Sequence, residues 1–334
     1  MSEAKPTRAH AFLARANARS EGIGEKWSAS NEQWWDWYLS LAYNDGGETG
    51  ATVSAPPLPE CTPPTKAALE AELAAPYPLP AHAIERFRRE GHVKLRAVCS
   101  APALLLLRRE LDSLFASVLA GAPAMGFPSL DMMWTVSEVA RAFVTSRRLA
   151  RIAAELLGVP AVRLYHDNAL SKLPGCGRTP WHYDAHHYPI ASENVVTVWL
   201  PLQPTPREMG PIAFARGIEC WRRVAELEFS KFDDSYDRGI ARALRDAGVS
   251  LDDGPFELGE LSFHHTRSLH TAGPNRTDLA RMALATTYLE DGARMVEDPT
   301  MISGDYEKFM PGVGPGDPIA TELNPVLYDP RGTA

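Results

Sequence analysis

Cysteine is scarce in this chain, and its few thiols do not form the pattern of a disulfide or zinc framework. Four cysteines stand far apart among the 334 residues, at Cys61, Cys99, Cys176 and Cys220. Disulfide-rich scaffolds and structural zinc sites carry cysteines in paired, regular spacings. The sequence therefore predicts free thiols in a reducing compartment, and we expect a cytoplasmic protein.

Long hydrophobic runs are also missing, which argues against a membrane-spanning helix. Such a helix needs about 18 or more consecutive apolar residues, whereas the run Leu104–Leu107 is short and is followed by charged residues. The stretch Met1–Arg19 is rich in Ala and Arg and lacks the apolar segment of a secretory signal. We therefore expect no membrane among the partners of this protein.

Basic clusters are absent as well. The formal net charge is −8, and no run of Lys and Arg interrupts this acidic balance. A nucleic-acid groove needs a basic stripe or patch, so nucleic acid is not an expected partner. A small-molecule substrate is the partner that remains.

The chain is long enough to bury one large core, because 45% of its 334 residues are hydrophobic. We expect one β-rich domain over residues 81–334, preceded by an N-terminal extension over residues 1–80. The extension combines a Trp-rich helical stretch within Trp27–Tyr43 with a Pro-rich linker, which a short helix over residues 66–75 interrupts. The aromatic stretch is predicted to dock against the domain or a second subunit, as in a homodimer. A substrate lid is the alternative.

Periodic patterns predict the elements of the domain. Apolar residues at helical spacing, a capping position or a terminal Gly mark the helices, and alternation marks the strands. The predicted helices cover residues 81–90 and 101–119, with a helix pair over 137–157, and predicted strands cover 92–95, 161–170 and 194–202. A charged helical insertion is expected near residues 219–255, close to the mouth of the barrel, and residues 292–334 are expected to wrap the domain.

His182 and Asp184 form the most informative pair in the sequence. Residues two positions apart on an extended strand point to the same side, so these two side chains make half of a metal site. A third ligand must come from elsewhere, and His270, at the end of a second apolar segment, is the candidate. Two imidazoles and one carboxylate on one face of a metal leave positions open, which suits non-haem Fe(II) that activates oxygen.

Arg281 follows His270 by 11 residues (281 − 270 = 11), an odd spacing that lets both face one cavity when a turn joins their strands. A guanidinium there could bind a carboxylate through two parallel hydrogen bonds.

The chain resembles the phytanoyl-CoA dioxygenase family of Fe(II)/2-oxoglutarate oxygenases over roughly residues 80–290. The matching residues are Trp181–Asp184, Gly259–Leu261, Leu269–His270, Gly273–Asn275 and Arg281, with Ile84–Val93 resembling the opening helix and strand.

The resemblance implies a mainly β fold with flanking helices, a double-stranded β-helix of the jelly-roll or cupin-like kind. It implies Fe(II) bound by His182, Asp184 and His270, with 2-oxoglutarate bound by Arg281 and O₂ as the oxidant. Related halogenases have Gly or Ala in place of the carboxylate, so Asp184 favours hydroxylation, desaturation or ring formation.

Further residues are expected to contact 2-oxoglutarate. The resemblance points to Asn168 and Lys172 on the strand before the site and to the ring of Trp199. Family members often carry a Ser two residues after the distal His, where this chain has Ala272, so Thr271 is a candidate source of the missing hydroxyl.

Substrate contacts are the least defined part of the prediction. Trp134, His187 and Arg216 are candidates, against a packed loop, an exposed histidine and a structural salt bridge as the ordinary alternatives. The Trp-rich extension suggests a small hydrophobic molecule of secondary metabolism. The competing functions are a CoA-thioester hydroxylase, a jelly-roll isomerase that uses no 2-oxoglutarate, and a non-catalytic binding module.

Overall fold

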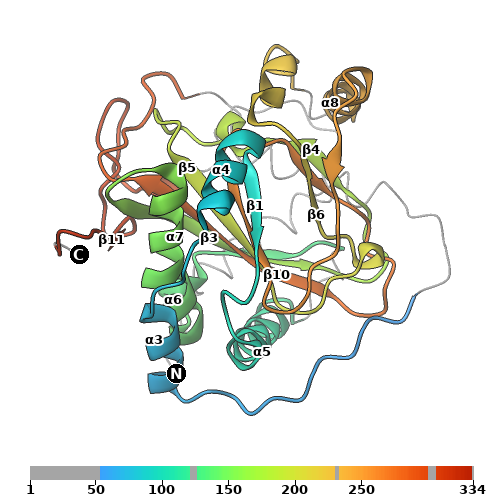
Figure 1. The fold of residues 1–334 in the computed structure, drawn as a ribbon, viewed down its shortest axis with the longest axis vertical. Helices are drawn as coiled ribbons and strands as arrows, with labels where there is room; N and C mark the ends of the chain where they lie inside the picture. Colours follow the sequence, from blue (N-terminus) through green and yellow to red (C-terminus); the bar gives the residue numbers. More distant parts are fainter. Residues whose placement is uncertain (1–52, 121–125, 230–232, 300–305, 333–334) are drawn as a thin grey trace, which may run out of the picture.

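A computed structural model describes residues 53–120, 126–229, 233–299 and 306–332 (Figure 1). Its helices are α3 (Lys66–Ala74), α4 (Ala81–Glu90), α5 (Ala101–Val118), α6 (Glu138–Val144), α7 (Arg147–Leu157) and α8 (Ser235–Asp246). Its strands are β1 (His92–Leu95), β2 (Ser129–Asp131), β3 (Val162–Lys172), β4 (Thr179–His182), β5 (Val195–Pro201), β6 (Ile212–Ala215), β7 (Leu251–Asp252), β8 (Leu261–His265), β9 (His270–Ala272), β10 (Arg281–Glu290) and β11 (Val326–Tyr328). Short 3₁₀ turns are η1 (Met133–Thr135), η2 (Asp184–His186), η3 (Arg207–Met209), η4 (Ile218–Arg223) and η6 (Tyr306–Lys308).

Two antiparallel sheets make up the body of the protein. The larger has the order β1-β8-β5-β10-β3-β11, with β2 added beside β3, and the smaller has the order β4-β9-β6-β7. The sheets face each other: the ring of His92 on β1 stacks on Phe214 of β6 at 4.4 Å, and His264 on β8 lies 4.5 Å from the ring of His270 on β9. The arrangement is the predicted double-stranded β-helix.

Side chains of the large sheet alternate between its two faces. On β5, Val196, Val198 and Leu200 belong to the main hydrophobic core, whereas Thr197 and Trp199 point toward the small sheet, where they contact Asp184 and Phe256. The outer face is therefore apolar, and the inner face carries the polar and aromatic groups of the interior.

Helices cover the outer face of the large sheet. α7 contacts β3, β5, β10 and β11, and α3 and α6 lie beside it (Figure 1). The helices begin where the sequence offers hydroxyl caps: Ser100, Ser137 and Ser146 accept hydrogen bonds from backbone amides three residues on. Gly91 ends α4 in the left-handed conformation, with φ of 81°.

The insertion near residues 219–255 forms η4, α8 and β7, with α8 beside β4. Asp237 on α8 is buried and receives hydrogen bonds from the guanidinium of Arg178 and from the backbone amide of Trp181, the latter at 2.7 Å. Because Trp181 directly precedes His182, this carboxylate fixes the strand that carries the His-x-Asp pair.

The predicted elements of the domain are confirmed with small differences. The helix over 81–90 and the strand over 92–95 have the predicted bounds, and the segment 137–157 is a helix pair. β3 runs two residues further than predicted, and the C-terminal segment, predicted as a wrapping tail, adds β11 to the large sheet beside β3. The Trp-rich stretch within Trp27–Tyr43 lies outside the described residues. In the part of the chain that the structure describes, no helix is both long and apolar enough to cross a membrane.

We expect Asp237→Ala to lower the free energy of unfolding by about 3 kcal/mol, because it removes one member of a buried, hydrogen-bonded ion pair. Chemical denaturation measures this change. Asp234→Ala is the matched control on the same helix, since its ion pair with Arg238 is exposed and worth about 0.5 kcal/mol or less. Equal effects of the two substitutions would contradict an anchoring role for Asp237.

Candidate metal centre and active site

Three side chains that are far apart in the sequence converge between the two sheets. His182 ends β4 and His270 begins β9, and the two residues are directly paired across these strands. Tyr183 is extended, so Asp184 lies on the same side as His182, although Asp184 opens the 3₁₀ turn η2 rather than continuing the strand. One potential ligand atom from each of the three side chains lies within 4.8 Å of the other two.

Both imidazole rings are oriented by the backbone, with Nε2 directed toward Asp184. Nδ1 of His182 lies 2.9 Å from the carbonyl oxygen of Pro180, and Nδ1 of His270 lies 2.9 Å from that of Ser268. A ring that donates from Nδ1 leaves the lone pair on Nε2, and both Nε2 atoms face Oδ1 of Asp184, at 4.0 and 3.7 Å. Burial lowers the pKa of both histidines, which favours the neutral imidazole that a metal requires.

The other oxygen of Asp184 is bound by the large sheet. Oδ2 accepts a hydrogen bond from Oγ1 of Thr197 at 2.9 Å and lies 3.3 Å from Nε2 of His264. Burial acts to raise the pKa of Asp184, but the hydrogen bond from His264 and the electrostatic attraction of the neighbouring imidazoles lower it below the ordinary value. The carboxylate is therefore ionised, with Oδ2 occupied and Oδ1 directed to the histidines.

A row of polar side chains crosses the large sheet beneath Asp184. Thr197 on β5 is in register with His264 on β8 and with Thr287 on β10. The hydroxyls of Thr197 and Thr287 are 3.0 Å apart, and the hydroxyl of Tyr188 lies 3.3 Å from that of Thr287. The position of the carboxylate is thus set by residues on three neighbouring strands and on the loop after η2.

Arg281 begins β10 and is buried, with 2% of its surface exposed. Its guanidinium carbon lies 5.5 Å from the ring centre of Phe127 and 5.4 Å from that of Trp199. Lys172 is its direct partner in the register of β3 and β10, and Nζ of Lys172 donates to Oγ1 of Thr179 and to the carbonyl of Gly273. Two cations therefore lie side by side at one end of the inner face, a suitable site for the carboxylate of a small acid.

Arg281 does not reach this cavity through a hairpin with the strand of His270, as its spacing suggested. β9 and β10 belong to different sheets, and the two side chains meet the same interior because the sheets face each other.

The other predicted co-substrate residues fall into two groups. Trp199 and Lys172 lie beside Arg281, and Asn168 is on the same inner face of β3, with Nδ2 donating to Asp131 at 2.7 Å. Thr271 does not fit its predicted role, because its hydroxyl donates to the backbone carbonyl of Thr179 on the neighbouring strand.

The three residues predicted to contact the substrate lie in different parts of the structure. His187 is buried with its ring 6.4 Å from that of His182. Trp134 packs against the hydrophobic core of the helical layer. Arg216 belongs to a group of basic side chains around Asp252, at 3.8 Å. The placement of Trp134 and Arg216 favours structural roles over substrate contact.

The sequence did not indicate which residues hold the side chain of Asp184 in place. His264 and His265 are adjacent, and only the inward-facing His264 contacts Asp184, whereas His265 accepts a hydrogen bond from the backbone amide of Arg267. Thr197 is the one hydroxyl within an apolar strand, which was the available signal.

Aromatic side chains from η2 and the insertion gather beside the triad. Nδ1 of His186 is 2.7 Å from the hydroxyl of Tyr236 on α8, and Phe229 lies edge-on to both His186 and His187. Trp221 on η4 lies 6.3 Å from the ring of Tyr183. This cluster covers the segment that follows His182 and limits the access of water to it.

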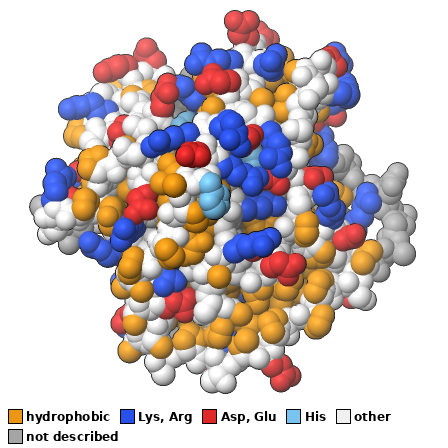
Figure 2. Space-filling view, viewed as in Figure 1, with side chains coloured by type: hydrophobic (Ala, Val, Ile, Leu, Met, Phe, Trp, Pro, Cys, Tyr) orange, Lys and Arg blue, Asp and Glu red, His pale blue; other side chains and the backbone are white. Residues whose placement is uncertain are grey.

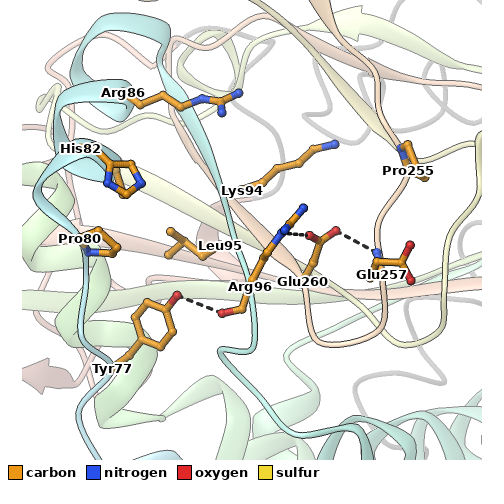
Figure 3. Close-up of a pocket in the computed structure, with 11 residues that line it drawn as sticks. Tyr77, Pro80, His82, Arg86, Lys94, Leu95, Arg96, Pro255, Glu257 and Glu260 are labelled. Carbon is orange, nitrogen blue, oxygen red and sulfur yellow. Dashed lines mark hydrogen bonds and ion pairs between the residues drawn. The ribbon is translucent and has the colours of Figure 1, made fainter.

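A pocket of about 590 Å³ lies apart from these residues, between α4, β1 and the loop before β8 (Figure 3). Lys and Arg side chains gather over this face (Figure 2). Protein acceptors already bind them: Lys94 donates to the carbonyl of Gly254, and Arg96 donates to Glu260. Arg86 pairs with Asp252 at 2.6 Å. No residue of the triad lines the pocket.

The donor set fits Fe(II). Two neutral imidazole nitrogens and one carboxylate oxygen on one side of a point leave the remaining coordination positions open, as in iron sites that activate oxygen. The orientation of both rings by backbone carbonyls and of Asp184 by two donors supplies the second layer of contacts that metal ligands need.

The chain is similar to a known family and to known proteins. A family model described as "Phytanoyl-CoA dioxygenase (PhyH)" matches residues 69–283. A curated relative from Stutzerimonas stutzeri, "Probable alpha-ketoglutarate-dependent hypophosphite dioxygenase", is 26% identical over 175 residues, which are 50% of this chain and 58% of the relative. The matched region thus spans little more than half of that relative.

Solved structures share the fold. The "non-heme alpha ketoglutarate dependent carbocyclase SnoK from nogalamycin biosynthesis" is 23% identical with a TM-score of 0.64, covering 76% of this chain and 100% of SnoK. The "epimerase SnoN in complex with Fe3+, alpha ketoglutarate and nogalamycin RO" is 24% identical with a TM-score of 0.60, covering 74% and 98%. EctD from S. alaskensis, solved with 2-oxoglutarate and 5-hydroxyectoine, is 17% identical with a TM-score of 0.57, covering 75% and 92%.

We expect Thr197→Val to weaken the binding of a divalent metal about tenfold, because it removes a hydrogen bond that orients Asp184 at unchanged side-chain volume. Titration of the metal-free protein with Mn²⁺, followed by electron paramagnetic resonance, measures the affinity. Thr286→Val is the matched control, a buried threonine one step from Thr287 on β10 that faces away from the site. Unchanged affinity in Thr197→Val would refute the role of this hydroxyl.

Proposed function

The chain belongs to the phytanoyl-CoA dioxygenase family, whose model matches residues 69–283, and we propose that it is an Fe(II)/2-oxoglutarate-dependent oxygenase acting on a small organic molecule. The observation that carries the proposal is the convergence of His182, Asp184 and His270 in one interior that also holds the buried Arg281. A metal triad alone would fit several chemistries. The buried guanidinium adds a site for a dicarboxylic acid.

His182, Asp184 and His270 would hold the iron. Bound iron, with 2-oxoglutarate as the source of electrons, would supply the oxygen activation needed to break a C–H bond. The protein's part is geometric: backbone carbonyls fix both imidazoles, and Thr197 and His264 keep Oδ2 of Asp184 engaged. The carboxylate would therefore take one coordination position and leave others for co-substrate and oxygen.

Arg281 would bind the far carboxylate of 2-oxoglutarate. The rings of Phe127 and Trp199 flank its guanidinium and exclude water, which strengthens a charge-assisted hydrogen bond. Lys172 adds a second positive charge beside it without being required as a direct contact, since its ammonium group already donates to Thr179 and Gly273.

The reaction type follows from the residues present. A carboxylate at position 184 fills the place that a halide would need, which favours hydroxylation, desaturation or ring formation over halogenation. The similar solved structures include a carbocyclase and an epimerase from nogalamycin biosynthesis. We infer a tailoring reaction of secondary metabolism for this chain as well.

Replacing Arg281 tests the proposal. We expect Arg281→Ala to raise the half-saturating concentration of 2-oxoglutarate about 100-fold, because two charge-assisted hydrogen bonds are lost. Anaerobic titration of the Fe(II)-loaded protein, following the visible charge-transfer band, measures the affinity, and succinate release measures turnover. Arg276→Ala, at an exposed arginine five residues upstream, is the control and should leave the band unchanged.

Two outcomes of this experiment would favour other functions. Full activity of Arg281→Ala on a substrate, with no succinate formed, would indicate a metal-dependent isomerase. Failure of the wild-type protein to bind Fe(II) after anaerobic reconstitution would indicate a non-catalytic binding module.

A further inference from the structure

Buried polar atoms without a hydrogen-bond partner gather on the inner face of β2 and β3. They are Nδ1 of His166, Oδ1 of Asn168 and Oγ of Ser129. Ser129 and Asn168 face the interior because their cross-strand partners are Leu170 and Asp131, and Leu170 packs on the interior side. Such atoms normally find partners in a folded protein, so a group of them on one strip points to a ligand that supplies the partners.

His166 is buried, with 8% of its surface exposed, and aromatic rings surround it. Its ring stacks on Phe309 at 4.4 Å with an interplanar angle of 21°, and the ring of Tyr188 meets it edge-on at 5.6 Å. Phe309 follows η6 in the C-terminal segment, so chain segments more than 140 residues apart (309 − 166 = 143) enclose one imidazole. Aromatic faces beside hydrogen-bonding groups suit a ligand with both C–H and hydroxyl surfaces.

The strip lies next to the metal centre. His166 is in register with Thr287 on β10, which is in register with Thr197, the residue that binds Asp184. The hydroxyl of Tyr188 also reaches that of Thr287. A ligand held by His166 would therefore lie beside the support of the metal ligands, and Asn168 lies between His166 and the end of the strand that pairs with Arg281.

This side of the interior carries little net charge. Asp131 pairs with Lys308 at 2.7 Å and also accepts a hydrogen bond from Asn168. Burial lowers the pKa of His166 to about 4, so its imidazole is neutral at neutral pH. The opposite end holds Arg281 and Lys172 side by side. Anionic groups are thus favoured at one end only.

We propose that His166, Asn168 and the ring of Phe309 form the substrate subsite, with Asn168 contacting the substrate instead of the 2-oxoglutarate that the resemblance suggested. The ligand of this subsite is a neutral molecule bearing hydroxyl groups, such as a polyol or glycoside. The inference rests on the proposed function and names its substrate class. A hydroxyl group both donates and accepts, so it can satisfy Oδ1 of Asn168 and a ring nitrogen of His166. A phosphate or carboxylate group would instead lie near Lys308. The positive charge of Lys308 is already balanced by Asp131, so an anionic group would gain little binding energy there.

The first test needs no substrate. His166→Phe keeps a ring against Phe309 and removes an unpartnered buried polar atom, so we expect the melting temperature of the ligand-free protein to rise by about 2 °C. His265→Phe is the matched control, because the pKa of His265 is also lowered to about 4 by burial but its Nδ1 accepts a hydrogen bond from Arg267. It should lower the melting temperature. A comparable loss in His166→Phe would mean that the imidazole is structural, and would overturn the proposal.

The second test measures recognition on the full chain loaded anaerobically with Fe(II) and 2-oxoglutarate. The probes are neutral methyl glycosides and cyclitols, each paired with its uronate or phosphate counterpart. We expect neutral probes to perturb the charge-transfer band, and His166→Phe to require about tenfold more probe for the same change. A response to the anionic counterparts alone, no response to any neutral probe, or an unchanged response in His166→Phe would overturn the proposal.

The two levels of inference fail separately. If wild-type protein gives no charge-transfer band with Fe(II) and 2-oxoglutarate, the proposed function is wrong. If the band forms equally in wild type and His166→Phe while their responses to the probes are identical, only the substrate subsite is wrong.

Discussion

The pairing of β4 with β9 is the constraint on which the rest of the site depends. It sets His182 directly opposite His270. Nδ1 of each ring lies at hydrogen-bond distance from the backbone carbonyl two residues earlier in the chain, so the backbone determines where Nε2 points. Asp184 then completes the group from the first residue of η2. A site built on paired strands keeps its geometry without a bound ligand, because moving one ring would require breaking strand pairing.

The large sheet divides the interior into regions of different chemistry. At one end Arg281 and Lys172 bring two positive charges to the inner face, and near the metal centre Thr197 and His264 support the carboxylate. Level with this support across the sheet, around His166, the interior is aromatic and nearly neutral. Two ligands of opposite character can therefore bind side by side without competing, because each would find its complementary groups only in its own region.

The insertion contacts the strand of His182 through α8 and pairs with β6 through β7. Asp237 on α8 binds the backbone beside His182, and Tyr236, its neighbour on the same helix, reaches the ring of His186. The same short helix thus fixes β4 and shields the turn that carries Asp184. Stability and access to the metal centre depend on one element, which explains why a charged, surface-like segment contains a buried aspartate and a buried tyrosine.

The sequence by itself determined the local elements and the four residues of the proposed centre. Helical spacing and alternation are local properties. The order and spacing of His182, Asp184, His270 and Arg281 indicated the centre, and the resemblance to a family gave these residues their roles. Only the tertiary structure decided the contacts between strands. His264, but not its neighbour His265, contacts Asp184, and Thr197 donates a hydrogen bond to the same carboxylate. The hydroxyl of Thr271 donates to a backbone carbonyl of β4. Register and the packing of two sheets fix these contacts, and neither is written in the spacing of residues along one strand.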